Sequence, residues 1–144
     1  MTRDWEGDKK IPKMTLKESL IRDEGIRLTI YNDTRGIPTI GVGRNLLDHG
    51  ISEEEAILLL ENDILDCKAL LAKHLEWSDR LDTPRREVLL NMLFNLGLGG
   101  LLKFVKMLDA LEKQNYSSAA KEMLDSQWAK QTGARAERLS KQMV

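Results

Sequence analysis

The sequence predicts an α+β fold that is mostly helical, in which a small lobe with a β-hairpin is joined by a long helix to an all-helical lobe. Apolar residues alternate with a period of two only within residues 27–44, which is typical of strands. After Gly50 they recur every three or four residues, which is typical of helices. We expect a single domain over the 144 residues. Its parts are a small lobe at about 15–55, an interlobe helix at about 53–74 and a helical lobe at about 75–144.

The first predicted helix covers residues 16–24. Thr15 followed by Glu18 is the pattern of a capping box, in which each side chain accepts a hydrogen bond from the backbone N–H of the other residue. Apolar residues with helical spacing follow. Gly25 suits a left-handed turn, so the helix is expected to end after Glu24.

A β-hairpin is predicted next. Leu28 and Ile30 alternate with other residues on the first strand, and Ile40 and Val42 do so on the second. Between them lies the segment Asn32–Gly36, whose Asn, Asp, Thr and Gly residues favour a turn. No other stretch of the sequence has a strand pattern.

The rest of the chain is predicted to be helical. Ser52 with Glu55 is a second capping box and opens a helix to about His74. Thr83 is expected to be an N-cap, with Pro84 at the first helical position.

That helix is expected to end at Gly97. Shorter helices are predicted over Leu101–Glu112, Ser118–Leu124 and Gly133–Met143, the last capped by Thr132.

Composition restricts the partners. The net charge of −1 argues against nucleic acid or an anionic membrane as a partner. The final segment, Gln127–Val144, is locally basic, which fits either a solvated helix face or a surface for an anionic polymer. Residues 1–14 are polar and charged, so no signal peptide is predicted, and no stretch approaches the roughly 18 apolar residues of a membrane span.

The cysteine and histidine residues predict neither an intramolecular disulfide nor a metal site. The single cysteine, Cys67, excludes an intramolecular disulfide and is expected to be a small buried hydrophobic residue. His49 and His74 lie far apart without a companion Cys or acidic motif, so no metal site is predicted.

Two carboxyl groups are the first candidates for catalysis. Glu24 is predicted at a helix C-terminus, where the negative end of the helix dipole disfavours its charged form. Asp33 is predicted in an exposed turn, where it stays ionised, and Thr39 lies on the returning strand. Two carboxyl groups in unlike environments are what glycoside hydrolysis by acid and base requires. The alternative is that both are ordinary surface residues among the 23 acidic residues of the chain.

Three blocks carry a resemblance to a known family. They are Glu24–Gly43, with Glu24-Gly25, Tyr31-x-Asp33-x-x-Gly36 and Thr39-Ile40-Gly41-Val42-Gly43, then Arg85–Gly97, and then Trp128–Arg138. In this order they resemble the phage-type lysozymes of glycoside hydrolase family 24, which include T-even phage lysozymes and prophage endolysins. The resemblance covers nearly the whole chain after Met14.

The resemblance implies the role of each candidate. Glu24 matches the proton donor to the glycosidic oxygen, Asp33 the second carboxylate, and Thr39 the threonine that helps to hold the attacking water. The implied reaction is hydrolysis of the β-1,4 bond between N-acetylmuramic acid and N-acetylglucosamine in peptidoglycan. Because a water held between Asp33 and Thr39 needs room, inversion of the anomeric configuration is expected. No cofactor is implied.

The resemblance also implies substrate-binding residues. Arg135 matches an arginine that approaches the catalytic glutamate across the cleft; alternatively, it is one more charge on a basic helix. Phe94 matches a cleft-lining aromatic residue; alternatively, it packs in the core. The backbone around Leu46 matches a substrate contact. Met107 and Glu122 fall on two further cleft positions but differ in type from the family, so no role is assigned to them.

Arg44 departs from the T-even pattern. Those relatives have a histidine here that pairs with an aspartate on the long helix, and that aspartate corresponds to Asp63. We therefore predict an ion pair between Arg44 and Asp63. The alternative is that Arg44 points into the cleft and contacts the substrate.

The implied setting is bacterial lysis by a monomer whose partner is the peptidoglycan glycan strand. The protein is expected to be made in the host cytoplasm without a signal peptide and to act on the periplasmic wall after release, for which a holin is one route. Two rival functions are a non-catalytic peptidoglycan-binding or phage structural module of the same fold, and an enzyme acting on a related polymer such as chitin.

Overall fold

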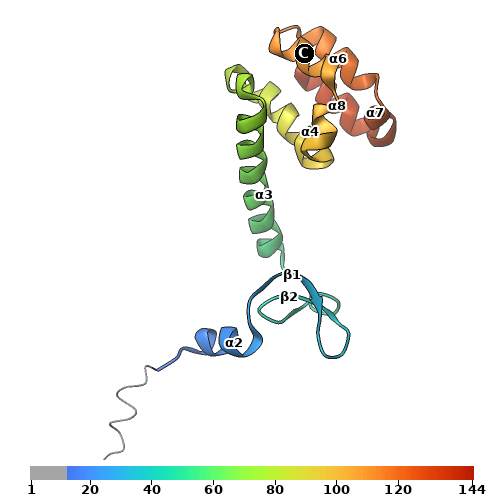
Figure 1. The fold of residues 1–144 in the computed structure, drawn as a ribbon. Coiled ribbons are helices and arrows are strands. Elements are labelled where there is room, and N and C mark those ends of the chain that lie inside the picture. Colours follow the sequence, from blue (N-terminus) through green and yellow to red (C-terminus); the bar gives the residue numbers. More distant parts are fainter. Residues whose placement is uncertain (1–12) are drawn as a thin grey trace, which may run out of the picture. The chain divides into compact units, whose positions relative to one another are not determined.

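The computed structural model describes residues 13–144, which fall into two compact units. The boundary between the units lies after Ala56, inside the long helix α3 (Glu53–His74). The first unit holds a helix and a small sheet, and the second is helical (Figure 1). The predicted α+β class with mostly helical content is confirmed.

From residue 13 on, the first unit begins with helix α2 (Leu16–Glu24), and the predicted capping box is present. The Glu18 backbone N–H donates to Thr15 Oγ1 at 3.0 Å, and the Thr15 N–H donates to Glu18 Oε1 at 3.1 Å. Gly25 ends the helix with φ 78° and ψ 169°, and its N–H donates to the carbonyl of Ile21. A left-handed φ of this kind favours glycine, so both predicted ends of this helix are confirmed.

A three-stranded antiparallel sheet follows, in the order β1 (Arg27–Asn32), β2 (Pro38–Gly41), β3 (Arg44–Asn45). Thr39 pairs with Tyr31 on one side and with Asn45 on the other. The hairpin is confirmed, but β2 ends one residue before Val42, because Val42 and Gly43 form the tight turn into β3. The sequence analysis missed β3, since two residues are too few to show an alternating pattern.

Helix α3 begins with the second capping box. The Ser52 N–H donates to Glu55 Oε1 at 2.8 Å, and the Glu55 N–H donates to Ser52 Oγ at 3.1 Å. The helix ends at His74, as predicted. Cys67 is half-buried rather than buried, because it packs at the edge of the core. Even so, burial is the main reason why the pKa of its thiol is raised, and the negative charges of Asp63 and Asp66 add to the effect.

The second unit continues with short helices. These are the 3-10 helix η1 (Glu76–Arg80), then α4 (Thr83–Leu102), α5 (Val105–Glu112), α6 (Tyr116–Leu124), α7 (Gln127–Thr132) and α8 (Ala134–Met143). Among the described residues no single helix is long and apolar enough to span a membrane; α4 and α5 satisfy length and composition only as a pair bent by 105°.

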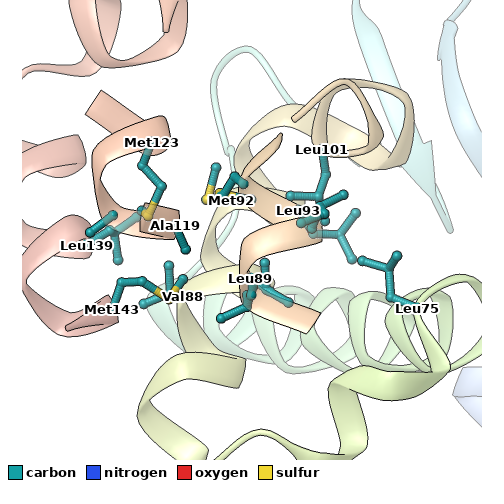
Figure 2. Packing of buried hydrophobic residues seen from close by; sticks show 14 of the residues in the cluster. Leu75, Val88, Leu89, Met92, Leu93, Leu101, Ala119, Met123, Leu139 and Met143 are labelled. Carbon is teal, nitrogen blue, oxygen red and sulfur yellow. The ribbon is translucent and has the colours of Figure 1, made fainter. Parts of the chain in front are cut away.

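The core of the second unit is formed mainly by α4, α5, α6 and α8. Val88, Leu89 and Met92 of α4 are fully buried. Figure 2 shows them in one cluster with Met123 of α6 and residues of α8. Burying one such side chain contributes roughly 1.5–3 kcal/mol, so this cluster is the main source of stability for the unit.

The start of α4 differs from the prediction by one residue. The N-cap is Asp82, so Thr83 and Pro84 both lie within the first turn. The Asp82 carboxylate does not bond the helix backbone; instead its Oδ2 accepts a hydrogen bond from Arg85 Nη1 at 2.8 Å. The helix was expected to end at Gly97; Gly97 is indeed not helical, with φ 75° and ψ 169°, but helical residues resume after it and α4 extends to Leu102.

The remaining helices are more broken than predicted. The helix expected over Leu101–Glu112 is interrupted at Phe104, whose ψ of 56° is not helical. Helix α6 begins two residues before Ser118. Helix α7 was missed, and because it exists, Thr132 does not cap α8: its hydroxyl donates to the carbonyl of Trp128 inside α7.

Candidate active site

Glu24 is the last residue of α2, and its side chain is exposed. Its carboxyl group lies against the turn between β2 and β3. A Cβ atom built on Gly43 would be 2.8 Å from Glu24 Oε1 and 3.1 Å from the carboxyl carbon. The end of α2 therefore places this carboxyl group against the turn between β2 and β3.

Asp33 is held by the turn that it occupies. Its Oδ1 accepts hydrogen bonds from the backbone N–H groups of Arg35 at 2.8 Å and Ile37 at 2.9 Å. The hydrogen bond from the Ile37 backbone is the largest cause that holds the pKa of Asp33 below its ordinary value. Burial, the next largest effect, opposes it, and the backbone and charge of Arg35 lower the pKa further. Asp33 is therefore ionised at neutral pH, as the sequence analysis expected.

Thr39 is buried, with only 3% of its surface exposed. Its Oγ1 donates to the carbonyl of Ile37 at 2.8 Å. Because a hydroxyl carries one proton, this bond leaves Oγ1 only as an acceptor toward a further group such as water.

The backbone of Ile37 thus connects the two side chains. Its N–H donates to Asp33, and its carbonyl accepts from Thr39 and also from the Asp33 N–H at 3.0 Å. One residue, Ile37, therefore bonds both Asp33 and Thr39, and it is a supporting residue that the sequence analysis missed.

Leu46 lies just beyond β3 and is half-buried. Its backbone N–H donates to the carbonyl of Pro38 at 2.9 Å, which continues the pairing of β2 and β3. A contact between this backbone and a substrate would therefore use the carbonyl rather than the N–H.

The predicted ion pair between Arg44 and Asp63 is wrong. Arg44 Nη1 and Nη2 each donate to a carboxylate oxygen of Glu55 at 2.7 Å, and Nη1 also donates to the carbonyl of Gly50 at 3.1 Å. The guanidinium is therefore engaged by Glu55 and by the Gly50 carbonyl. The physical reason is the capping box, which turns the Glu55 carboxylate back toward the start of α3.

The Arg44–Glu55 pair changes the acidity of Glu55. Hydrogen bonds from Arg44, and then from the Ser52 backbone, lower the pKa of Glu55 from 4.5 to about 2. The sequence contained a signal for this pair, because the capping box already placed a carboxylate near the loop that follows β3.

In the second unit, Phe94 and Arg135 line the same open groove, with a volume of about 600 Å³. The groove is lined by residues of α3, α4 and α8. Phe94 is 47% exposed, which rules out the alternative that it is a core residue. Arg135 Nε donates to Asn91 Oδ1 at 2.9 Å, so Asn91 orients the arginine.

A second groove of about 570 Å³ contains the two positions that were not assigned, Met107 and Glu122. Phe104 and Trp128 also line it, and their rings meet edge to face with centroids 6.0 Å apart. Trp128 Nε1 donates to Asn95 Oδ1 at 2.8 Å, which satisfies the buried indole N–H.

The structure thus places Glu24, Asp33, Thr39 and Leu46 in the first unit, and Phe94 and Arg135 in the second. Among residues 13–144, no three His, Cys, Asp or Glu side chains are grouped so that they could hold a metal ion.

Comparisons with known proteins point to one family. The family model described as phage lysozyme matches residues 22–142. The chain is 33% identical over 158 residues to the pre-baseplate central spike protein Gp5 of Enterobacteria phage T4, which covers 90% of this chain and 27% of that protein. It is 32% identical over 155 residues to the probable T4-type lysozyme 1 of Dictyostelium discoideum, covering 87% of this chain and 91% of that protein. The endolysin of Salmonella phage P22 is 31% identical over 110 residues, covering 70% of this chain and 73% of that protein.

Proposed function

This chain belongs to the phage lysozyme family, which supports a glycosidase activity of the lysozyme type. We propose that it cleaves the β-1,4 bond between N-acetylmuramic acid and N-acetylglucosamine in peptidoglycan. The observation that carries the proposal is the link from Asp33 through Ile37 to Thr39. This link holds an ionised carboxylate and a hydroxyl acceptor together, as a group that activates water requires.

In this mechanism Glu24 is the general acid. It gives its proton to the glycosidic oxygen as the bond from that oxygen to the anomeric carbon breaks. Its exposed position at the end of α2 leaves the carboxyl group open to a large polymer. Removal of a general acid typically costs about 10²–10⁴ in rate.

Asp33 and Thr39 act on the water. The water donates one hydrogen bond to Thr39 Oγ1, whose own proton is committed to Ile37, and its other proton passes to Asp33. The water oxygen bonds the anomeric carbon from the face opposite to the leaving group. This geometry inverts the configuration, for which the carboxyl groups of Glu24 and Asp33 should be about 6.5–9.5 Å apart.

We assign substrate contacts to three further residues. Phe94 offers an exposed ring to a sugar face, and Arg135, held by Asn91, offers a charge or hydrogen bonds. Leu46 offers its backbone carbonyl. No cofactor enters the reaction, because the two carboxyl groups supply its proton transfers.

The biological role that we propose is lysis of a bacterial host by a monomer that reaches the periplasmic wall, with a holin as one route. The similarity to the central spike protein of phage T4 supports a second role for this chain, in which it carries out the same hydrolysis during entry through a phage tail. Mass spectrometry of purified phage particles separates the two, because only a tail protein would be retained in them.

The chemistry is tested on purified peptidoglycan. Mass spectrometry of the released fragments should show new reducing ends on N-acetylmuramic acid, and NMR of the first product should show the α-anomer. Chitin is the second substrate in the same assay. Faster release from chitin, or a β-anomeric first product, would contradict the proposed substrate or the proposed role of Thr39.

A further inference from the structure

Two glycines flank Val42 in the segment that joins β2 to β3, and they share a backbone conformation but not an environment. Gly41 has φ 69° and Gly43 has φ 64°, both in the left-handed region that favours glycine. A Cβ atom on Gly41 would meet nothing within 4 Å. On Gly43 the same atom would meet the carboxyl end of Glu24, at 2.8 Å from Oε1 and 3.3 Å from Cγ. The missing side chain of Gly43 therefore leaves the space that this carboxyl group occupies.

The backbone of Glu24 is fixed near this turn. Gly25 ends α2 directly after Glu24, and three residues after Glu24 the chain enters β1 at Arg27. Arg27 pairs with Gly41 across the sheet. The Glu24 side chain, by contrast, has several rotatable bonds and is exposed, and the backbone at Gly43 limits where its carboxyl group lies on that side.

The turn itself is anchored more firmly than the Glu24 side chain. Arg44 pairs with Ile40 in the sheet, and its guanidinium is bonded to Glu55 and to the Gly50 carbonyl. A methyl group added at Gly43 would therefore move the flexible Glu24 carboxyl group and leave the anchored backbone in place.

We infer that Gly43 is a positioning residue for the acid Glu24, which it holds in the place from which the proton is delivered. The inference rests on the proposed function, in which Glu24 is the proton donor. A general acid must lie within hydrogen-bond reach of the oxygen that it protonates, and a misplacement of about 1 Å can cost about 100-fold in rate.

The test compares Gly43→Ala with Gly41→Ala, which carries the same left-handed strain without the collision. On peptidoglycan, Gly43→Ala should lower kcat by about tenfold or more with little change in KM, and should shift the limb of the pH–rate profile that reports the acid. Gly41→Ala should keep kcat within about threefold of wild type once matched for folded fraction. Equal kcat values and pH profiles for the two variants would overturn the inference.

A second measurement does not depend on activity. In a Glu24→Ala background the collision partner is gone, so the loss of stability caused by Gly43→Ala should shrink, whereas that caused by Gly41→Ala should not change. Urea unfolding of the single and double variants measures both. If Gly43→Ala costs the same stability with and without Glu24, the inference fails. If Glu24→Gln retains full activity, the proposed function fails instead.

Discussion

Replacing Thr39 by valine separates its chemical role from its structural one. Valine has nearly the same shape as threonine and carries a methyl group in place of the hydroxyl. That hydroxyl makes one hydrogen bond, to the Ile37 carbonyl at 2.8 Å, and the same carbonyl also accepts the Asp33 N–H at 3.0 Å. The carbonyl therefore keeps a partner in Thr39→Val, so the loss of stability should be that of an ordinary hydrogen bond, about 0.5–1.5 kcal/mol.

The effect on activity should be much larger. Thr39→Val removes the acceptor for the attacking water, and we expect kcat on peptidoglycan to fall by about 10²-fold or more, at the lower end of the range for loss of a catalytic acid or base. Thr39→Ser is the matched control, because it keeps the hydroxyl and should retain most of the activity. Initial rates of turbidity clearing and urea unfolding measure the two effects. A Thr39→Val enzyme with near wild-type kcat would refute the assignment.

Three further predictions address the acid, the Arg44–Glu55 pair and the core. Glu24→Gln should abolish clearing of permeabilised cells, a loss of about 10²–10⁴, with an unchanged circular dichroism spectrum; clearing at the wild-type rate would exclude Glu24 as the acid. Folding lowers the pKa of Glu55 to about 2, so its ionised form stabilises the folded state above pH 4.5, and this contribution is lost as the pH falls toward 2. The difference in unfolding free energy between wild type and Glu55→Gln, which keeps the capping box, should therefore shrink over that range. The control Asp63→Asn should have the same unfolding free energy as wild type. A difference between wild type and Glu55→Gln that does not depend on pH would contradict the Arg44–Glu55 pair. Met92→Ala, in a fully buried position, should cost about 2–5 kcal/mol in urea unfolding, against under about 0.5 kcal/mol for the exposed Val105→Ala; equal costs would show that this core is misidentified.

Sequence reasoning succeeded where a feature depends on residues close together in the chain. The capping boxes at Thr15 and Ser52 and the helix end at Gly25 are local hydrogen-bond patterns, and all three are present. It failed where the outcome depends on tertiary contacts rather than on a local pattern. Arg44 was expected to pair with Asp63 but bonds Glu55, and β3 exists only through its pairing with β2.

The same distinction holds for the candidate site. Glu24, Asp33 and Thr39 were singled out mainly because the block that contains them resembles the family's motif, and their catalytic roles remain predictions. The supporting contacts of Ile37 and Gly43 depend on a backbone carbonyl, a backbone N–H and a missing Cβ. None of these leaves a chemical signature in the sequence, so only the folded chain reveals them.

The use of the Ile37 main chain has a consequence for how the site can vary in evolution. Every bond that residue 37 makes to Asp33 and Thr39 comes from its peptide groups, so many side chains could stand there without loss. Proline alone is barred on chemical grounds, because it has no N–H to give to Asp33. The following Pro38 also reduces the dependence on the side chain at position 37, because a residue before proline is biased toward an extended backbone. Related sequences should therefore tolerate wide substitution at this position while excluding a second consecutive proline.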